Sequence, residues 1–154
     1  MKKPRIDEQA VVADGAVVLG DVTIEKDVSI WYNAVIRGDV NSISIGEGTN
    51  IQDLAVLHVD ADASLAIGKN VTIGHGAILH GCTIKDQALI GMGAIVLNGA
   101  VIGKGSMIAA GALVPQNTVV PDGALYIGNP AKFRRMLTEE ELTANLKNAA
   151  NYIK

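Results

Sequence analysis

The chain has 154 residues, of which 49% are hydrophobic and 19% are charged, so it is long enough for one well-buried domain and too short for two. Its 13 Lys and Arg residues nearly balance its 16 Asp and Glu residues, and no block of like charge predicts a nucleic-acid or anionic-membrane surface. The single cysteine, Cys82, cannot form an internal disulfide, and the sequence has neither a signal-peptide pattern nor an apolar span of about 18 residues. We therefore expect a cytoplasmic protein that binds neither nucleic acid nor membrane.

An aliphatic residue recurs at every sixth position over most of the chain. The spacing slips by three residues after Ile36 and by four after Leu57, and the unit after Leu79 is one residue short. A small residue usually stands four positions after the aliphatic one, and glycine often follows it directly. The repeat has about 18 units, whose aliphatic residues are Val12, Val18, Ile24, Ile30, Ile36, Ile45, Ile51, Leu57, Ile67, Ile73, Leu79, Ile84, Ile90, Val96, Ile102, Ile108, Val114 and Val120.

A period of six excludes an amphipathic helix, whose apolar stripe needs spacings of three and four. Short strands bent at regular corners fit the period, because small residues and glycine permit tight corners while the aliphatic residues stack into ladders. The alternative is a Val- and Ile-rich sandwich, which would show a period of two with irregular turns. The sequence therefore predicts an all-β solenoid over residues 1–137, with a short lead-in before the first repeat.

The C-terminal segment, residues 138–154, has a different pattern. Thr138 followed by three glutamates predicts a helix that begins with a capping box. We expect this helix to pack on the flank of the solenoid, and prolines just before it predict irregular structure there. Its apolar stripe would be Leu142, Leu146, Ala149, Ala150 and Ile153, and the prolines are Pro115, Pro121 and Pro130.

The repeat resembles the left-handed parallel β-helix of the superfamily that includes hexapeptide acyltransferases and gamma-class carbonic anhydrases. In that superfamily three units make one triangular turn, which implies a left-handed β-helix of about six turns. His58 and His80 each follow the aliphatic residue of their unit, in units that are three apart. They should therefore occupy equivalent outward positions in consecutive turns, about 4.8 Å apart, where two imidazoles can bind one metal ion.

His75 should lie on a different face, because it is the second residue after Ile73. A three-fold assembly that sets one face of the prism against the adjacent face of a neighbour would bring His75 of one chain to His58 and His80 of the next. The sequence thus predicts a homotrimer with three metal sites between subunits. Three imidazoles leave a fourth position for water, as in catalytic zinc sites.

Four further residues are candidates for this site. Arg37 should lie one turn from His58, and with Asp39 it could form an ion pair at the subunit interface, orient a bound anion, or do both. Asp53 is in register with His75 and could fix the tautomer of its ring, while Gln52 could hydrogen-bond a water on the metal.

The segments 37–39, 50–53 and 75–80, together with His58, resemble the gamma-class carbonic anhydrase signature. The resemblance implies that the three histidines bind Zn²⁺, or Fe²⁺ or Co²⁺, and that Arg37, Asp39, Gln52 and Asp53 support the interface and order water and bicarbonate. Active members of that family carry glutamates linked to proton export, where this chain has Val40 and the loop 59–62. The resemblance therefore implies a slow or buffer-dependent enzyme, with Asp60 and Asp62 as the remaining acidic groups of the loop.

The leading hypothesis is reversible hydration of carbon dioxide to bicarbonate. A CoA-dependent hexapeptide acyltransferase is the second, although such an enzyme needs one histidine as general base and not three in related positions. A third is a metal-binding scaffold subunit with little activity. Two residues near these motifs stay open, because Cys82 is either a buried thiol or a ligand, and Tyr126 either packs or reaches the site.

Overall fold

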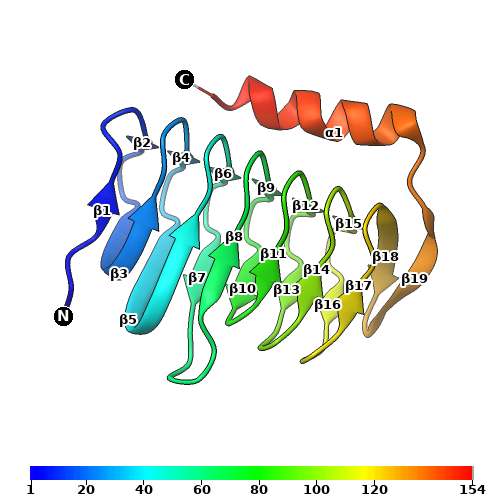
Figure 1. The fold of residues 1–154 in the computed structure, drawn as a ribbon, viewed down its shortest axis with the longest axis horizontal. Helices are drawn as coiled ribbons and strands as arrows, with labels where there is room; N and C mark the ends of the chain where they lie inside the picture. The colour runs from blue at the N-terminus through cyan, green and yellow to red at the C-terminus, as the bar shows by residue number, and fades with distance from the viewer. Residues whose placement is uncertain (154) are drawn as a thin grey trace.

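The computed structural model describes residues 1–153, which form a triangular β-solenoid followed by one helix (Figure 1). Three faces run along the solenoid axis, and we name each by two of its strands. The β7–β10 face contains β3 (Val17–Ile24), β5 (Val35–Ile45), β7 (Val56–His58), β10 (Ile78–His80), β13 (Ile95–Val96) and β16 (Leu113–Val114).

Strands β3 and β5 are long enough to turn the corner onto the next face, so one 11-stranded sheet covers two faces. The β8–β11 face contains β1 (Arg5–Ile6), the second halves of β3 and β5, β8 (Leu65–Ile67), β11 (Thr83–Ile84), β14 (Val101–Ile102) and β17 (Val119–Val120). The β6–β9 face is a separate sheet of β2 (Val11–Val12), β4 (Ser29–Ile30), β6 (Asn50–Ile51), β9 (Thr72–Ile73), β12 (Leu89–Ile90), β15 (Met107–Ile108), β18 (Ala124–Gly128) and β19 (Ala131–Met136).

The predicted aliphatic ladders are confirmed by the strand registers. On the β7–β10 face, Ile36 pairs with Leu57 and Leu57 with Leu79, and all three side chains are buried. The solenoid has about seven turns, and the prediction of about six omitted one rung at each end. Ile6 pairs with Ile24, and Tyr126 pairs with Ile108, so both belong to ladders that the sequence reading had ended one unit too early.

The corners depend on close contact between turns. A Cβ atom on Gly91 would lie 2.5 Å from the backbone nitrogen of Ala110 in the next turn, so only glycine fits there. The two slips in the repeat are accommodated outside the ladders, the first within β5 and the second in a loop after β7 in which Asp60 bridges to Ala63. The register of the core therefore survives both insertions.

The prediction of irregular structure around the prolines was wrong for Pro115 and Pro121. Pro115 directly follows β16 and Pro121 directly follows β17, and these two strands are the outermost strands of their sheet. A proline there sacrifices no ladder hydrogen bond, because no strand lies beyond it to accept one. The chain then continues through β18 and turns back as the antiparallel strand β19.

The C-terminal helix α1 (Glu139–Asn151) begins as predicted, with Thr138 as its N-cap and a complete capping box to Glu141. The helix lies along the β6–β9 face (Figure 1). There, Tyr152 packs edge-on against Trp31, with 5.9 Å between the ring centroids. The predicted apolar stripe is only partly correct, because Ala149 is buried while Leu146 and Ala150 are exposed. The expected end of the helix at residue 154 lies outside the described residues; the described helix ends three residues earlier. Among residues 1–153, no helix has the length and apolar character needed to cross a bilayer.

We expect Thr138→Ala to destabilise α1 by about 1 kcal/mol, because the helix loses the side chain that accepts the Glu141 N–H. Hydrogen exchange of the amides in the first turn of α1 should become about fivefold faster, and Thr143→Ala, on the exposed side of the same helix, should leave it unchanged. Equal exchange in both variants would contradict the capping role.

Candidate metal centre

His58 and His80 lie side by side on the β7–β10 face, as predicted. They are in register at the ends of β7 and β10, and Nδ1 of His58 is 3.1 Å from Nε2 of His80. Two nitrogens bound to one tetrahedral zinc ion at about 2.1 Å would lie about 3.4 Å apart, so a small movement of the two rings would accommodate the ion. The pair is therefore a suitable half of a metal site.

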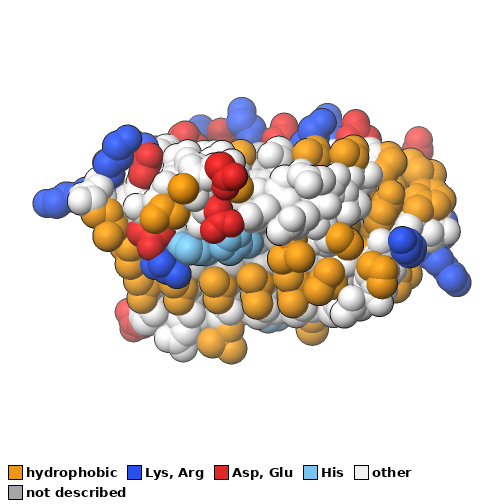
Figure 2. All heavy atoms as spheres, turned by 90° about the horizontal axis from the view of Figure 1, so that it is seen from below, with side chains coloured by type: hydrophobic (Ala, Val, Ile, Leu, Met, Phe, Trp, Pro, Cys, Tyr) orange, Lys and Arg blue, Asp and Glu red, His pale blue; other side chains and the backbone are white. Residues whose placement is uncertain are grey.

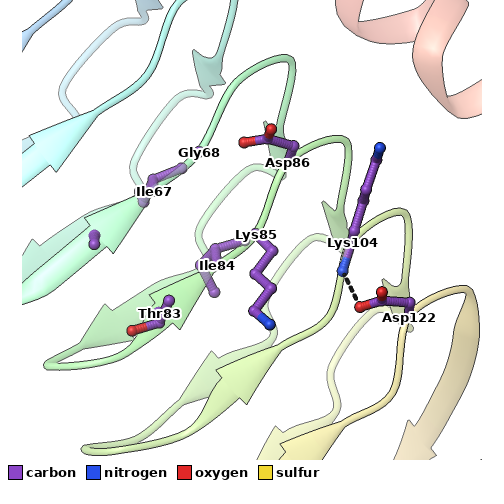
Figure 3. A pocket seen from close by; sticks show the side chains of 9 residues that line it. Ile67, Gly68, Thr83, Ile84, Lys85, Asp86, Lys104 and Asp122 are labelled. Atoms are coloured by element: carbon purple, nitrogen blue, oxygen red, sulfur yellow. Dashed lines mark hydrogen bonds between the residues drawn. The ribbon is translucent and has the colours of Figure 1, made fainter.

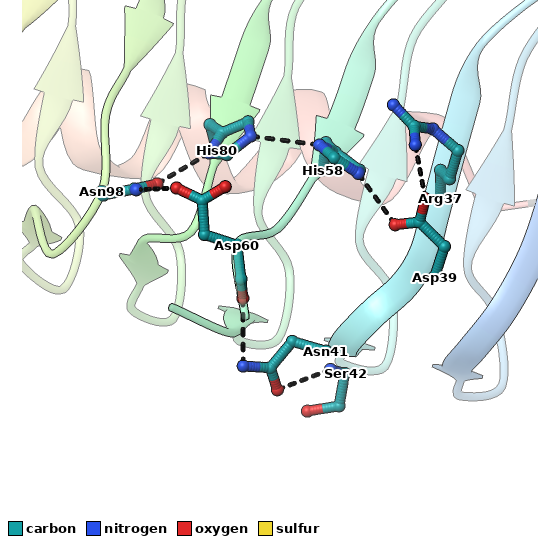
Figure 4. Close-up of polar contacts among 8 residues, drawn as sticks. All are labelled: Arg37, Asp39, Asn41, Ser42, His58, Asp60, His80 and Asn98. Atoms are coloured by element: carbon teal, nitrogen blue, oxygen red, sulfur yellow. Dashed lines mark hydrogen bonds and ion pairs between the residues drawn. The ribbon is translucent and has the colours of Figure 1, made fainter. Parts of the chain in front are cut away.

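Each of these rings is held by a hydrogen bond through its other nitrogen (Figure 4). His58 Nε2–H donates to Asp39 Oδ1 at 2.9 Å, and His80 Nδ1–H donates to Asn98 Oδ1 at 2.7 Å. In neutral rings held this way, the two facing nitrogens both carry lone pairs. Two lone pairs at this distance repel unless a proton or a cation lies between them, so the arrangement favours binding of a positive ion.

Asp39 has a second partner, the guanidinium group of Arg37, with which it forms an ion pair within one chain. The hydrogen bond from His58 is the main cause that lowers the pKa of Asp39 below its ordinary value, and the Arg37 contact adds to it. Asp39 therefore stays ionised and orients the His58 ring. The ion pair between Arg37 and Asp39 is thus within one chain, a pair at the subunit interface stays a prediction, and Arg37 remains about half exposed.

His75 lies apart from the other two histidines, at the corner that follows β9. Its Nδ1 atom is 2.9 Å from Asp53 Oδ1, which confirms the predicted proximity of these two residues. This contact leaves Nε2 available, and about half of the side chain is exposed. Within residues 1–153 of one chain, no three His, Cys, Asp or Glu residues gather closely enough to hold a metal ion. A single chain thus has two separate groups of candidate ligands.

Among residues 1–153, no hydrogen bond joins the Gln52 side chain to any of the three histidines. Its side chain is almost fully buried, and its amide donates to Asn50 Oδ1 at 3.0 Å. Asn50 in turn donates to Thr72 Oγ1, so these polar groups form a small buried network on the β6–β9 face. A contact of Gln52 with a water on the metal stays a prediction.

Cys82 and Tyr126 have structural positions. Cys82 is buried in the core, and desolvation raises the pKa of its thiol to about 12, which disfavours the thiolate that a metal would need. Tyr126 occupies the last rung of its ladder and packs against the core and Phe133.

Sequence reasoning missed Asn98 and considered Asp60 only as an acidic group of the loop. Asn98 Nδ2 donates to Asp60 Oδ2, so these two residues and His80 form a continuous chain of contacts. Asn98 lies one turn beyond Gly81, the neighbour of His80, so its register could have indicated the contact. The position of Asp60 could not have been found in this way, because it lies in the loop that the repeat does not describe.

A row of exposed and half-buried aliphatic side chains lies beside the histidine pair (Figure 2). These residues are the outward-facing partners of consecutive strands and extend over six turns. We call this row the aliphatic stripe, and it consists of Val17, Val35, Val56, Ile78, Ile95 and Leu113. At the corner that carries His75, the neighbouring residues Leu54 and Met92 are about 60% exposed. Apolar surface of this extent is typical of a face that contacts another chain.

A groove of about 460 Å³ lies elsewhere, along the β8–β11 face (Figure 3). Lys85, Lys104 and Asp122 are among the residues that line it, and none of the three histidines does. Asp122 accepts the backbone N–H of Lys104, so it stabilises the turn. The groove therefore has no histidine that could act as a general base.

Residues 81–116 match the family described as bacterial transferase hexapeptide (six repeats). A crystal structure of a hexapeptide transferase family protein from Anaplasma phagocytophilum has a TM-score of 0.94 and 51% identity, over 97% of this chain and 89% of that one. The fold and these matches define the class: this is a hexapeptide-repeat β-helix protein.

Two relatives define the family more narrowly. Gamma carbonic anhydrase 2, mitochondrial, from Arabidopsis thaliana is 52% identical over 99% of this chain, which spans 57% of the length of that relative. A protein from Methanocaldococcus jannaschii named "Probable carbonic anhydrase" is 54% identical over 97% of this chain and 94% of its own length. The chain belongs to the gamma carbonic anhydrase family.

We expect Asp39→Asn to change the pH dependence of stability in the metal-free protein. Since the pKa of Asp39 is lowered on folding, its carboxylate stabilises the folded state above the unfolded pKa of 3.8, and this contribution is lost as the pH falls through the folded value. Wild type should therefore be more stable than the variant above about pH 5, with the margin shrinking as the pH falls below that. Urea unfolding between pH 3 and pH 7 measures it, and a margin that does not change with pH would contradict this role.

Proposed function

We propose that this protein catalyses the reversible hydration of carbon dioxide at a zinc ion bound between the subunits of a homotrimer. One observation carries the proposal: two histidine rings present facing nitrogens on one face, while a third, exposed histidine is held by a carboxylate at another corner. The names of the relatives in the family support the choice of reaction. Fe²⁺ or Co²⁺ would also suit three imidazole ligands.

The donor set fits a catalytic zinc ion, because three imidazoles leave one coordination position open. A bound Zn²⁺ would supply a water with a pKa near 7 in place of 15.7. The protein's own residues determine the orientation of the ligands: Asp39 holds His58, Asn98 holds His80 and Asp53 lies against His75. Such partners fix the tautomer of a ligating ring and raise its basicity.

The homotrimer is supported by the surfaces on which the ligands lie. The aliphatic stripe adjoins His58 and His80, and the exposed side chains of Leu54 and Met92 neighbour His75, so pairing these two surfaces would bury apolar area and complete the ligand set. Arg37 lies at the same edge with an exposed guanidinium group, which suits it to hold a bicarbonate anion. The cytoplasmic location stays a prediction from the sequence.

Proton export is expected to limit the rate. Val40 is exposed where a carboxylate would assist, and the nearby Asp60 already accepts a hydrogen bond from Asn98. Asp62 is exposed in the same loop. Buffer molecules would therefore carry much of the proton transfer.

A CoA-dependent acyltransferase is the alternative enzyme on this scaffold, and a structural neighbour is named as a hexapeptide transferase family protein. Such an enzyme would need a histidine beside an acyl-CoA groove, whereas none of the three histidines lines the groove on the β8–β11 face. A scaffold subunit that binds metal without turnover is the third possibility, and only kinetics separates it from the first.

Carbon dioxide hydration, followed by stopped flow on metal-quantified protein, should rise in proportion to metal content and increase with buffer concentration. His80→Ala should abolish the activity, because the facing pair of nitrogens is lost. Metal-loaded protein that stays inactive at every buffer concentration would favour the scaffold, and tight acyl-CoA binding without metal would favour the acyltransferase.

Mixed trimers test whether each site is shared between subunits. Subunits with His75→Ala and subunits with His80→Ala, carrying different tags and co-expressed, should each be inactive alone. Random mixing should restore about one quarter of the wild-type sites, because a site with the intact pair from one chain and the intact His75 from the next then forms. The matched control co-expresses wild-type chains with the double variant His75→Ala/His80→Ala. A first mixture that recovers no activity would contradict a shared site.

A further inference from the structure

Three residues from separate segments, Asn41, Asp60 and Asn98, meet beside the histidine pair (Figure 4). Asn98 follows β13 and lies between His80 and the loop after β7, with its Oδ1 atom 2.7 Å from His80 Nδ1 and its Nδ2 atom against the Asp60 carboxylate. Asn41 donates from its side chain to the backbone carbonyls of Asp60 and Ala61, so it anchors the same loop. The carboxylate of Asp60 is thereby held at a defined place.

In the hydrogen bonds that link Asp60, Asn98 and His80, each donor and each acceptor is fixed by its chemistry. An ionised carboxylate only accepts hydrogen bonds, so Asp60 requires the NH₂ group of Asn98 on its side. The carbonyl oxygen of Asn98 must then face His80, and that oxygen also only accepts. His80 Nδ1 must therefore carry a hydrogen, which leaves the lone pair of the neutral ring on Nε2, the nitrogen that faces His58.

The backbone leaves space for this amide. Gly81, directly after His80, adopts a positive φ of 56°, and a Cβ atom there would lie 2.5 Å from Asn98 Oδ1. A residue with a side chain at position 81 would thus displace the acceptor of His80. The partners of the other two histidines differ from Asn98, because Asp39 and Asp53 are carboxylates. Either oxygen of a carboxylate can accept the hydrogen bond from the ring. An amide can present either end, so Asn98 needs a second residue to orient it.

Resting on the proposed metal site, we propose that Asn98 is a positioning residue that fixes the metal-binding tautomer of His80, and that Asp60 sets the orientation of the Asn98 amide. The loop between β7 and β8 then has a function in the site through Asp60, although it contributes no metal ligand. Mutation of a partner of this kind typically lowers metal affinity by about 10- to 100-fold.

The test reads the tautomer directly in the metal-free protein, by long-range ¹H–¹⁵N correlation spectra of labelled histidine. Wild type should show His80 with its hydrogen on Nδ1. Asn98→Leu, of similar size but without an acceptor, should lose this signature, and Asp60→Asn should weaken it. The double variant Asp60→Asn/Asn98→Asp reverses the two groups and restores an acceptor towards His80, so it should recover the signature. Asp62→Asn removes the same charge from the loop and should leave the tautomer unchanged, because Asp62 has no side-chain hydrogen bond or ion pair among residues 1–153.

Zn²⁺ affinity, measured by competition with a chelator on the same variants, is the second readout. Asn98→Leu should bind about 10- to 100-fold more weakly than wild type, and the double variant should recover most of the loss. A wild-type tautomer and affinity in Asn98→Leu, with binding lost in His80→Ala, would overturn the role of Asn98 while leaving the metal site intact. Wild-type protein that shows the expected tautomer but binds no metal would instead overturn the proposed function, and the tautomer result would still decide the role of Asn98.

Discussion

The in-register stacking of each turn on the next is the constraint on which the rest of this protein depends. Strands in neighbouring turns lie about 4.8 Å apart, and the backbone hydrogen bonds between them hold equivalent residues at that spacing. Inward positions form continuous aliphatic ladders such as Ile36, Leu57 and Leu79. Outward positions are aligned by the same bonds, so the register that builds the core also aligns any side chains one residue away from it.

The candidate metal centre uses this alignment. His58 and His80 each follow a core residue, and their rings meet because Leu57 and Leu79 are paired. Asp53 reaches His75 by the same rule on another corner. A shift of the register by one residue would turn the aliphatic residues outward and the histidines inward, so the core and the candidate site depend on the same register.

The repeat alone does not explain the finer features of the site. Asp39 lies in the slip within β5, and Asp60 lies in the loop after β7, which are the two places where residues are inserted into the period of six. Both insertions place a carboxylate beside the histidine pair, directly on His58 or through Asn98 on His80. The insertions thus supply the groups that orient the candidate ligands, while the uninterrupted turns supply the framework.

The sequence by itself determined the solenoid, its ladders, the capped helix and the pairing of His58 with His80, because each follows from spacing along one chain and from hydrogen bonds between adjacent turns. The tertiary structure decided what spacing does not encode: the buried face of α1 and the contact of Asn98 with Asp60. These depend on how a loop folds back and on which side of a helix meets the sheet, and both are set by packing between segments distant in the sequence.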